Sequence, residues 1–182
     1  FGDGESRRFT PKSFVFGGQY TLSPGMALAA NLSHTERAPS YAELYANGAH
    51  VATGQYEIGD PTLAVEKADG IDLQLKLRSA RASGSVGVFY NRFRNYIGLF
   101  DSGNTRSADG ALDPAKDPDN PGLTAEGEEI LPEVVVRPVR AVFYGIEADG
   151  RVPLFEGAAG RLEATLRGDY VHAEDRDSGD PL

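Results

Sequence analysis

The sequence predicts an all-β chain, folded as an antiparallel meander of about six long strands. The main observation is a side-chain pattern that repeats every two residues. It is clearest at residues 71–78, where Ile71, Leu73, Leu75 and Leu77 alternate with Asp72, Gln74, Lys76 and Arg78. Successive side chains of a strand point to opposite faces, so this segment has one apolar and one charged face.

The same period of two marks the other strands. From Phe14 onward, the even positions are mostly large and apolar and the odd ones mostly small or polar, with Gly18 and Val15 as the exceptions up to Leu22. We expect strands at 12–22, 26–34, 66–78, 84–100, 134–149 and 160–173. The strand at 84–100 loses its phase near Arg92, which makes its end the hardest to place.

The second observation is that the connections alternate in length. Residues 23–25, 79–83 and 150–159 are short connections, whereas 35–65 and 101–133 are long. A transmembrane β-barrel has tight periplasmic turns and long extracellular loops, with lipid outside and a polar lumen. Six strands do not close such a barrel, so we expect part of a larger one. A half-solvated antiparallel sheet is the alternative. In the barrel, the charged side chains would face the lumen, namely Asp72, Lys76, Arg78, Glu163, Arg167 and Asp169.

Composition excludes several functions. The net charge of −9 argues against nucleic acid as a partner, because phosphate binding needs clustered positive charge. Zero Cys excludes disulfides and thiolate metal sites. A mean hydropathy of −0.36 argues against a helical membrane protein. We find no nucleophile-elbow or phosphate-loop motif, and we expect that the chain is not an enzyme.

The long connection at 35–65 contains a helix-start signal. Ser40 follows Pro39 and precedes Glu43 by three positions, which is a capping box and predicts a short helix from Tyr41. Asn47 and Gly48 would supply a left-handed C-cap and end this helix. The sequence therefore predicts one short helix in an extracellular loop.

This stretch resembles the barrel domain of TonB-dependent outer-membrane receptors. The matching motif residues are Glu36, Arg37, Ala38, Pro39, Ser40, Glu43, Leu44, Tyr45, Asn47, Gly48, Tyr56, Glu57, Gly59 and Asp60, with His50 between them. Residues 89–97 and 144–147 look like later barrel strands of that family. The resemblance is greatest to the subgroup that includes zinc and other metal receptors, in which Pro commonly stands at the position of Ala49.

The resemblance implies a 22-stranded barrel in the Gram-negative outer membrane, in contact with lipid and filled by an N-terminal plug. Residues 1–182 would be part of the barrel domain, with the plug and the remaining strands outside this sequence. It also implies import of a scarce metal ion or metal chelate, driven by the TonB complex, which would act through that plug. No resident cofactor is implied, since zinc or a ferric chelate would be the cargo. A passive barrel or adhesin, and a soluble β-sandwich binding module, are the alternatives.

The candidate ligand-binding residues are His50, Tyr45, Tyr56 and Asp72. Imidazole with carboxylates suits zinc, which makes His50 the candidate metal ligand and zinc the first choice of cargo. Tyrosines suit a chelate, which is the second choice. The connection at 101–133 carries nine acidic residues against Arg106 and Lys116. We expect it to be a mobile, well-solvated loop, and as an alternative it would concentrate cations at the barrel mouth.

Overall fold

The computed structural model describes residues 7–158 and 160–182, which form eight strands and one short helix. The strands are β1 (Phe14–Ser23), β2 (Met26–Arg37), β3 (Asn47–His50), β4 (Gln55–Ile58), β5 (Glu66–Arg78), β6 (Ser83–Ser107), β7 (Ile130–Gly157) and β8 (Gly160–Asp175), and the helix is α1 (Tyr41–Tyr45). The chain divides into two compact units. A strand unit contains residues 10–37, 67–94 and 140–182, and a loop unit contains 7–9, 38–66 and 95–139.

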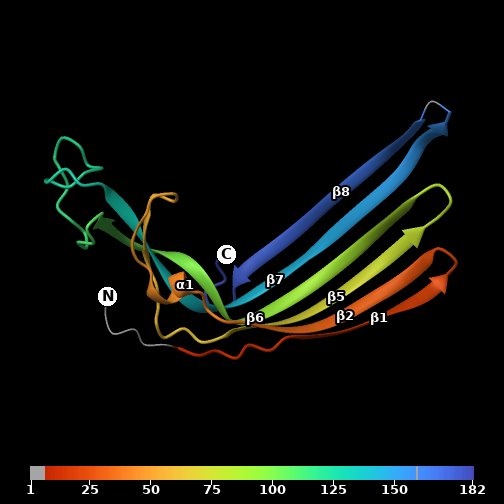
Figure 1. Cartoon of the computed structure of the whole chain (residues 1–182), viewed down its shortest axis with the longest axis horizontal. Helices are drawn as coiled ribbons and strands as arrows, with labels where there is room; N and C mark the ends of the chain where they lie inside the picture. Colours follow the sequence, from red (N-terminus) through yellow and green to blue (C-terminus); the bar gives the residue numbers. More distant parts are fainter. Residues whose placement is uncertain (1–6, 159) are drawn as a thin grey trace. The chain divides into compact units, whose positions relative to one another are not determined.

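The strand unit is one sheet with strand order β1-β2-β5-β6-β7-β8 (Figure 1). The ladders β1–β2, β5–β6 and β7–β8 are antiparallel, as in a meander. β1 and β8 are the two edges of the described sheet, so it is not closed into a barrel. The fold class predicted from the sequence is therefore confirmed, with six long strands in the predicted order.

The two faces of this sheet differ in chemistry. Cross-strand partners share a face, and the pairs Phe16–Leu32, Ile71–Tyr90 and Ile146–Tyr170 place large apolar side chains together. These six side chains are all exposed or half-exposed, Phe16 at 77%. An apolar face without a covering layer is what a lipid-facing barrel wall presents. We call this the outward face, and the opposite one the inward face.

Tight turns join the long strands at one end of the strand unit. Between β1 and β2, Gly25 has a φ of +86°, a conformation that a side chain disfavours. Its carbonyl accepts a hydrogen bond of 2.7 Å from the N–H of Arg78. Between β5 and β6, Ser79 and Ala82 close the turn with a 2.7 Å backbone bond. The β7–β8 turn is shorter than the predicted 150–159, and its residue Ala159 lies outside the described part of the chain.

The loop unit holds the principal hydrophobic cluster of the described residues. Leu44 from α1, Leu63, Ile97 from β6 and Val136 from β7 are buried together, and Phe9 packs against them. A barrel wall meets lipid on one side and the lumen on the other, so it has no need of a core. The connection 38–66, by contrast, folds back on β6 and β7 and buries its own apolar residues.

Two short strands that the sequence did not predict lie in this connection. β3 and β4 form an antiparallel hairpin, with Asn47 opposite Ile58 and His50 opposite Gln55. β4 then pairs in parallel with the first residues of β7, Tyr56 opposite Glu133 and Ile58 opposite Val135. The hairpin thus covers the β7 edge within the loop unit and satisfies backbone groups there.

The predicted helix is confirmed at its start and corrected at its end. The Glu43 N–H donates to Ser40 Oγ at 3.2 Å and the Ser40 N–H donates to the Glu43 carboxylate at 2.6 Å, which completes the capping box. The prediction that Asn47 and Gly48 form a left-handed C-cap was wrong. Ala46 is the C-cap, with φ −57° and ψ 135°, because the chain must become extended at once to enter β3.

The long connection at 101–133 is more structured than predicted. β6 continues to Ser107 and β7 begins at Ile130, so the irregular part is shorter. Isolated bridges such as Lys116–Thr124 hold it together, and Ser107 and Thr124 are almost fully buried. The expected well-solvated loop therefore has a polar interior of its own. Within the described residues, no helix has the length and apolar character to cross a membrane.

Candidate functional site

His50 lies at the end of β3, where the hairpin turns toward β4. Its Nδ1 is 3.0 Å from Thr53 Oγ1 and 3.4 Å from the Glu57 carboxylate. The His50 side chain is 53% exposed, so the ring is accessible to solvent and to a ligand. Metal-binding histidines commonly hold their second nitrogen against a carboxylate, which orients the ring. The hairpin gives His50 this arrangement.

Tyr56 is buried between the hairpin and β6. Its hydroxyl donates to Asn47 Oδ1 at 3.0 Å, and the Arg106 guanidinium lies 5.3 Å from its ring centre. The ring is 5% exposed, so its contacts inside the loop unit fix the hairpin on the sheet. Its role as a ligand contact stays a prediction.

Tyr45 lies in the last turn of α1, with its ring centre 5.2 Å from that of Tyr41. Tyr41 is 76% exposed and Tyr45 is 36% exposed, so the pair offers an aromatic surface to solvent. Aromatic surfaces of this kind suit a planar or aromatic chelate more than a bare ion.

The motif residues build the loop unit as well as marking the family. Gly59 is required by close packing, since a Cβ there would lie 2.7 Å from the Tyr45 nitrogen. The Asp60 carboxylate accepts a hydrogen bond from the Thr62 N–H at 2.8 Å. The backbone N–H of Asp60 donates to the Glu43 carbonyl at 2.9 Å. Leu44 is buried in the hydrophobic cluster. Much of the motif therefore specifies a folded connection, on which His50 is presented.

An ion pair between Arg106 and Glu133 lies at the base of the long acidic loop. Glu133 also accepts from Asn104 Nδ2 at 3.2 Å, and Ser102 Oγ donates to its carbonyl at the same distance. The Arg106 guanidinium holds the pKa of the Glu133 carboxyl below its usual value, and the side chain is only 5% exposed. From the sequence, both residues counted only among the charges of the loop and were not expected to pair. The available signal was a carboxylate inside the apolar run 130–136.

Asp72 lies in the strand unit, on the inward face of β5 opposite Phe89. It lines a hollow of about 500 Å³ with polar residues from four strands, among them Asn31, Asn91 and Glu147. The loop unit brings together His50, Tyr56 and Tyr45. Asp72 belongs to the other unit, so the predicted ligand contacts fall into two groups.

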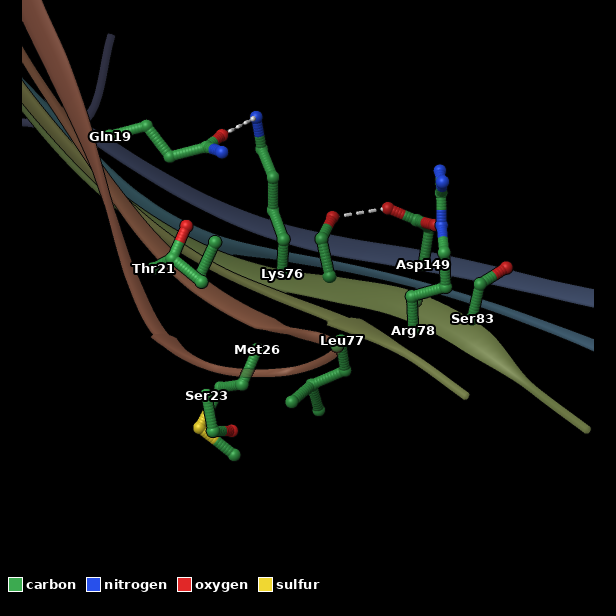
Figure 2. Close-up of a pocket in the computed structure, with 13 residues that line it drawn as sticks. Gln19, Thr21, Ser23, Met26, Lys76, Leu77, Arg78, Ser83 and Asp149 are labelled. Atoms are coloured by element: carbon green, nitrogen blue, oxygen red, sulfur yellow. Dashed lines mark hydrogen bonds between the residues drawn. The ribbon is translucent and has the colours of Figure 1, made fainter. Parts of the chain in front are cut away.

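A second hollow, of about 580 Å³, lies near the tight turns of the strand unit (Figure 2). Lys76 Nζ is 3.3 Å from Gln19 Oε1, and the Ser85 hydroxyl donates to the Asp149 carboxylate. Figure 2 shows the side chains of Gln19, Lys76 and Asp149, from β1, β5 and β7, on one side of the sheet. The inward face is therefore polar and hydrogen-bonded along the strands, as a lumen wall must be.

No group of three or more metal-ligating side chains occurs within residues 7–158 and 160–182. His50 would supply one ligand, because Glu57 faces its other ring nitrogen, whereas a zinc site usually has three or four. A metal bound at His50 would therefore need ligands from other parts of the protein or from a chelate.

The fold and the motif agree with comparison to known proteins. Residues 2–182 match the family model described as TonB dependent receptor-like, beta-barrel. The chain belongs to the TonB-dependent receptor family. Members are barrels of the Gram-negative outer membrane, and this is the location of the chain. The resemblance seen in the sequence is thereby confirmed.

Solved structures share the fold of this TonB-dependent receptor chain at low sequence identity. The copper transporter OprC matches with a TM-score of 0.63 and 18% identity, over 97% of this chain and 23% of OprC. The siderophore receptor PirA from Pseudomonas aeruginosa matches with 0.57 and 17%, over 90% and 25%. A variant of the ferric enterobactin receptor PfeA from the same organism matches with 0.58 and 16%, over 93% and 23%. The chain thus spans about a quarter of these receptors.

Proposed function

We propose that the protein containing this chain binds a scarce metal ion or metal chelate at the outer surface and imports it with energy from the TonB complex. Family membership supports the transport role. The observation that carries the ligand assignment is the His50 arrangement, in which a carboxylate orients an exposed imidazole. The acidic loop at 101–133 would favour a cation at the same mouth.

Zinc is the first candidate cargo and a ferric chelate is the second. Imidazole nitrogen and carboxylate oxygen are both ligands that zinc accepts. The exposed Tyr41–Tyr45 pair supports the chelate instead, because a chelate brings its own metal ligands and needs apolar and aromatic contacts. The names of the similar structures include both a copper transporter and siderophore receptors, which agrees with either class of cargo.

The test is growth of a strain that lacks the receptor, complemented with wild type, His50→Ala or His172→Ala. His172 is the matched control, because its imidazole lies on the outward face of β8, with its ring centre 4.9 Å from that of Tyr144. Removing one ligand of a metal site weakens binding by about tenfold or more. Under zinc restriction, His50→Ala should grow poorly and His172→Ala should grow normally.

Other results would redirect the proposal. Iron-limited growth that collapses on deletion, with zinc-limited growth unchanged, assigns a ferric chelate. If deletion changes growth under neither restriction, metal import is wrong, and the passive barrel or adhesin takes its place. Uptake that persists without the TonB complex would also identify a passive barrel.

A further inference from the structure

The outward face of the strand unit changes character at one level. On the side of the β5–β6 turn, the cross-strand pairs are apolar, such as Leu73–Val88 and Ile71–Tyr90. The next pairs on the same face are Asp69–Arg92 and Lys67–Arg94, so two residues further along each strand the surface is charged. On β2 the same change separates Leu32 from His34 and Glu36. An apolar band that ends at aromatic residues marks the edge of the hydrocarbon region in a barrel.

Aromatic residues lie at this edge. Phe14 is opposite His34, and their rings stack with centres 5.2 Å apart. Tyr90 lies opposite Ile71 on the neighbouring ladder. Rings of this kind sit at the level of the lipid headgroups. The charged residues beyond them therefore lie where the headgroups are.

The charged residues form a connected cluster, which we call the rim cluster: His34, Glu36, Lys67, Asp69, Arg92 and Arg94. Lys67 Nζ is 2.8 Å from the Glu36 carboxylate, and Arg94 is 2.8 Å from the Asp69 carboxylate. His34 Nδ1 lies 2.6 Å from the other Asp69 oxygen. Two carboxylates thus hold two cations and an imidazole in fixed positions on adjacent strands.

Arg92 is the member without such a contact. It is exposed on the outward face, opposite Asp69, and its guanidinium makes no hydrogen bond or ion pair with any described residue. The rim cluster therefore has one positive charge in excess, on a chain whose net charge is −9. An exposed guanidinium among partly exposed cations is the geometry that phosphate groups bind.

We propose that the rim cluster binds the phosphate groups of the lipid A headgroup in the outer leaflet of the membrane. Arg92 contacts a phosphate directly, and Lys67 and Arg94 supply further positive charge beside it. The carboxylates Glu36 and Asp69 keep those cations in place. This inference rests on the proposed orientation, in which 35–65 and 101–133 lie outside the cell. It concerns the lipid contact and not the cargo.

The test uses the purified full-length receptor in mild detergent and measures its affinity for bisphosphorylated lipid A. The variant is Arg92→Gln, which removes an exposed side chain and breaks no contact seen in the described residues. The matched control is Arg81→Gln, in the exposed β5–β6 turn. Loss of a charge-assisted phosphate contact should weaken lipid A binding by about tenfold, while Arg81→Gln should leave it unchanged. Arg92→Glu should weaken it further.

Two comparisons identify the source of the phosphate. Dephosphorylated lipid A should bind the wild-type receptor and Arg92→Gln with the same affinity. Excess inorganic phosphate should not displace bisphosphorylated lipid A from the wild-type receptor. The proposal is overturned if Arg92→Gln and Arg92→Glu bind lipid A like wild type, or if the phosphates make no difference. Efficient displacement by inorganic phosphate would instead indicate a site for the free anion. Metal uptake is measured separately, so failure here leaves the proposed function standing.

Discussion

The guanidinium of Arg106 near the end of β6 forms an ion pair with the carboxylate of Glu133 near the start of β7. The pair closes the base of the acidic loop, and Arg106 also lies over the Tyr56 ring of the β3–β4 hairpin. One side chain therefore links the two long connections within the loop unit. Because Glu133 is buried, the link depends on both partners being present.

Glu133→Gln should loosen the acidic loop without unfolding the barrel. A buried hydrogen bond between charged groups is worth about 2 kcal/mol, and its loss leaves the guanidinium of Arg106 without its carboxylate. Trypsin cleavage after Arg106, where Ser107 is buried, requires local opening. Cleavage should become about tenfold faster or more. Glu126→Gln, an exposed carboxylate in the same loop, should cleave at the wild-type rate.

The same pair predicts how the loop responds to pH. The pKa of Glu133 is lowered in the folded state, so its contribution to stability is complete above the ordinary glutamate pKa of about 4.3. That contribution is lost as the pH falls through the lowered value. Hydrogen-exchange protection of residues 101–133, corrected for intrinsic rates, should be constant near neutral pH and fall below about pH 4. Protection that declines between pH 7 and 5 would contradict this assignment.

Gly25→Ala should destabilise the turn between β1 and β2. Gly25 has a φ of +86°, and a Cβ there would lie 2.1 Å from the Arg78 carbonyl oxygen. The left-handed conformation alone costs about 1–2 kcal/mol for a residue with a side chain. Gly18→Ala is the control, since a Cβ there meets nothing within 4 Å. Urea unfolding of the receptor in detergent should separate the two variants, and equal midpoints would refute the argument.

Cysteine labelling tests the topology in the membrane. The chain has no Cys, so Asn120→Cys and Ser79→Cys each place a single thiol in a Cys-free parent receptor. Both positions are exposed, one in the acidic loop and the other in a tight turn. An impermeant maleimide applied to whole cells should label Asn120→Cys and spare Ser79→Cys. The reverse labelling pattern would show that the predicted orientation in the membrane is wrong.

The long strands were predictable because one physical rule sets them. A wall between lipid and water needs strict alternation, and Ile71 to Arg78 follow it without exception. On β6 the alternation continues to Arg94 and breaks at Asn95, whose φ is +56°. The loss of phase that the sequence suggested near Arg92 therefore occurs at Asn95, at the boundary between the two units, since Arg92 and Arg94 keep the register with β5.

The loop unit was harder to predict because its contacts are distant in sequence. The capping box of Ser40 and Glu43 is local and was found. The parallel ladder between Tyr56 and Glu133 joins residues that are far apart along the chain, and no local pattern indicates it. The predicted C-cap at Gly48 failed for the same reason, since pairing with β4 keeps Asn47 and Gly48 extended.

Accumulation of radiolabelled metal by whole cells tests the central proposal of energised import most directly. The strains are the receptor deletion, the deletion complemented with the receptor, and the complemented strain without a working TonB complex, each supplied with labelled zinc or a labelled ferric chelate. We expect one of these substrates to accumulate only in the complemented strain with TonB. Equal accumulation in all three strains for both substrates would contradict the account.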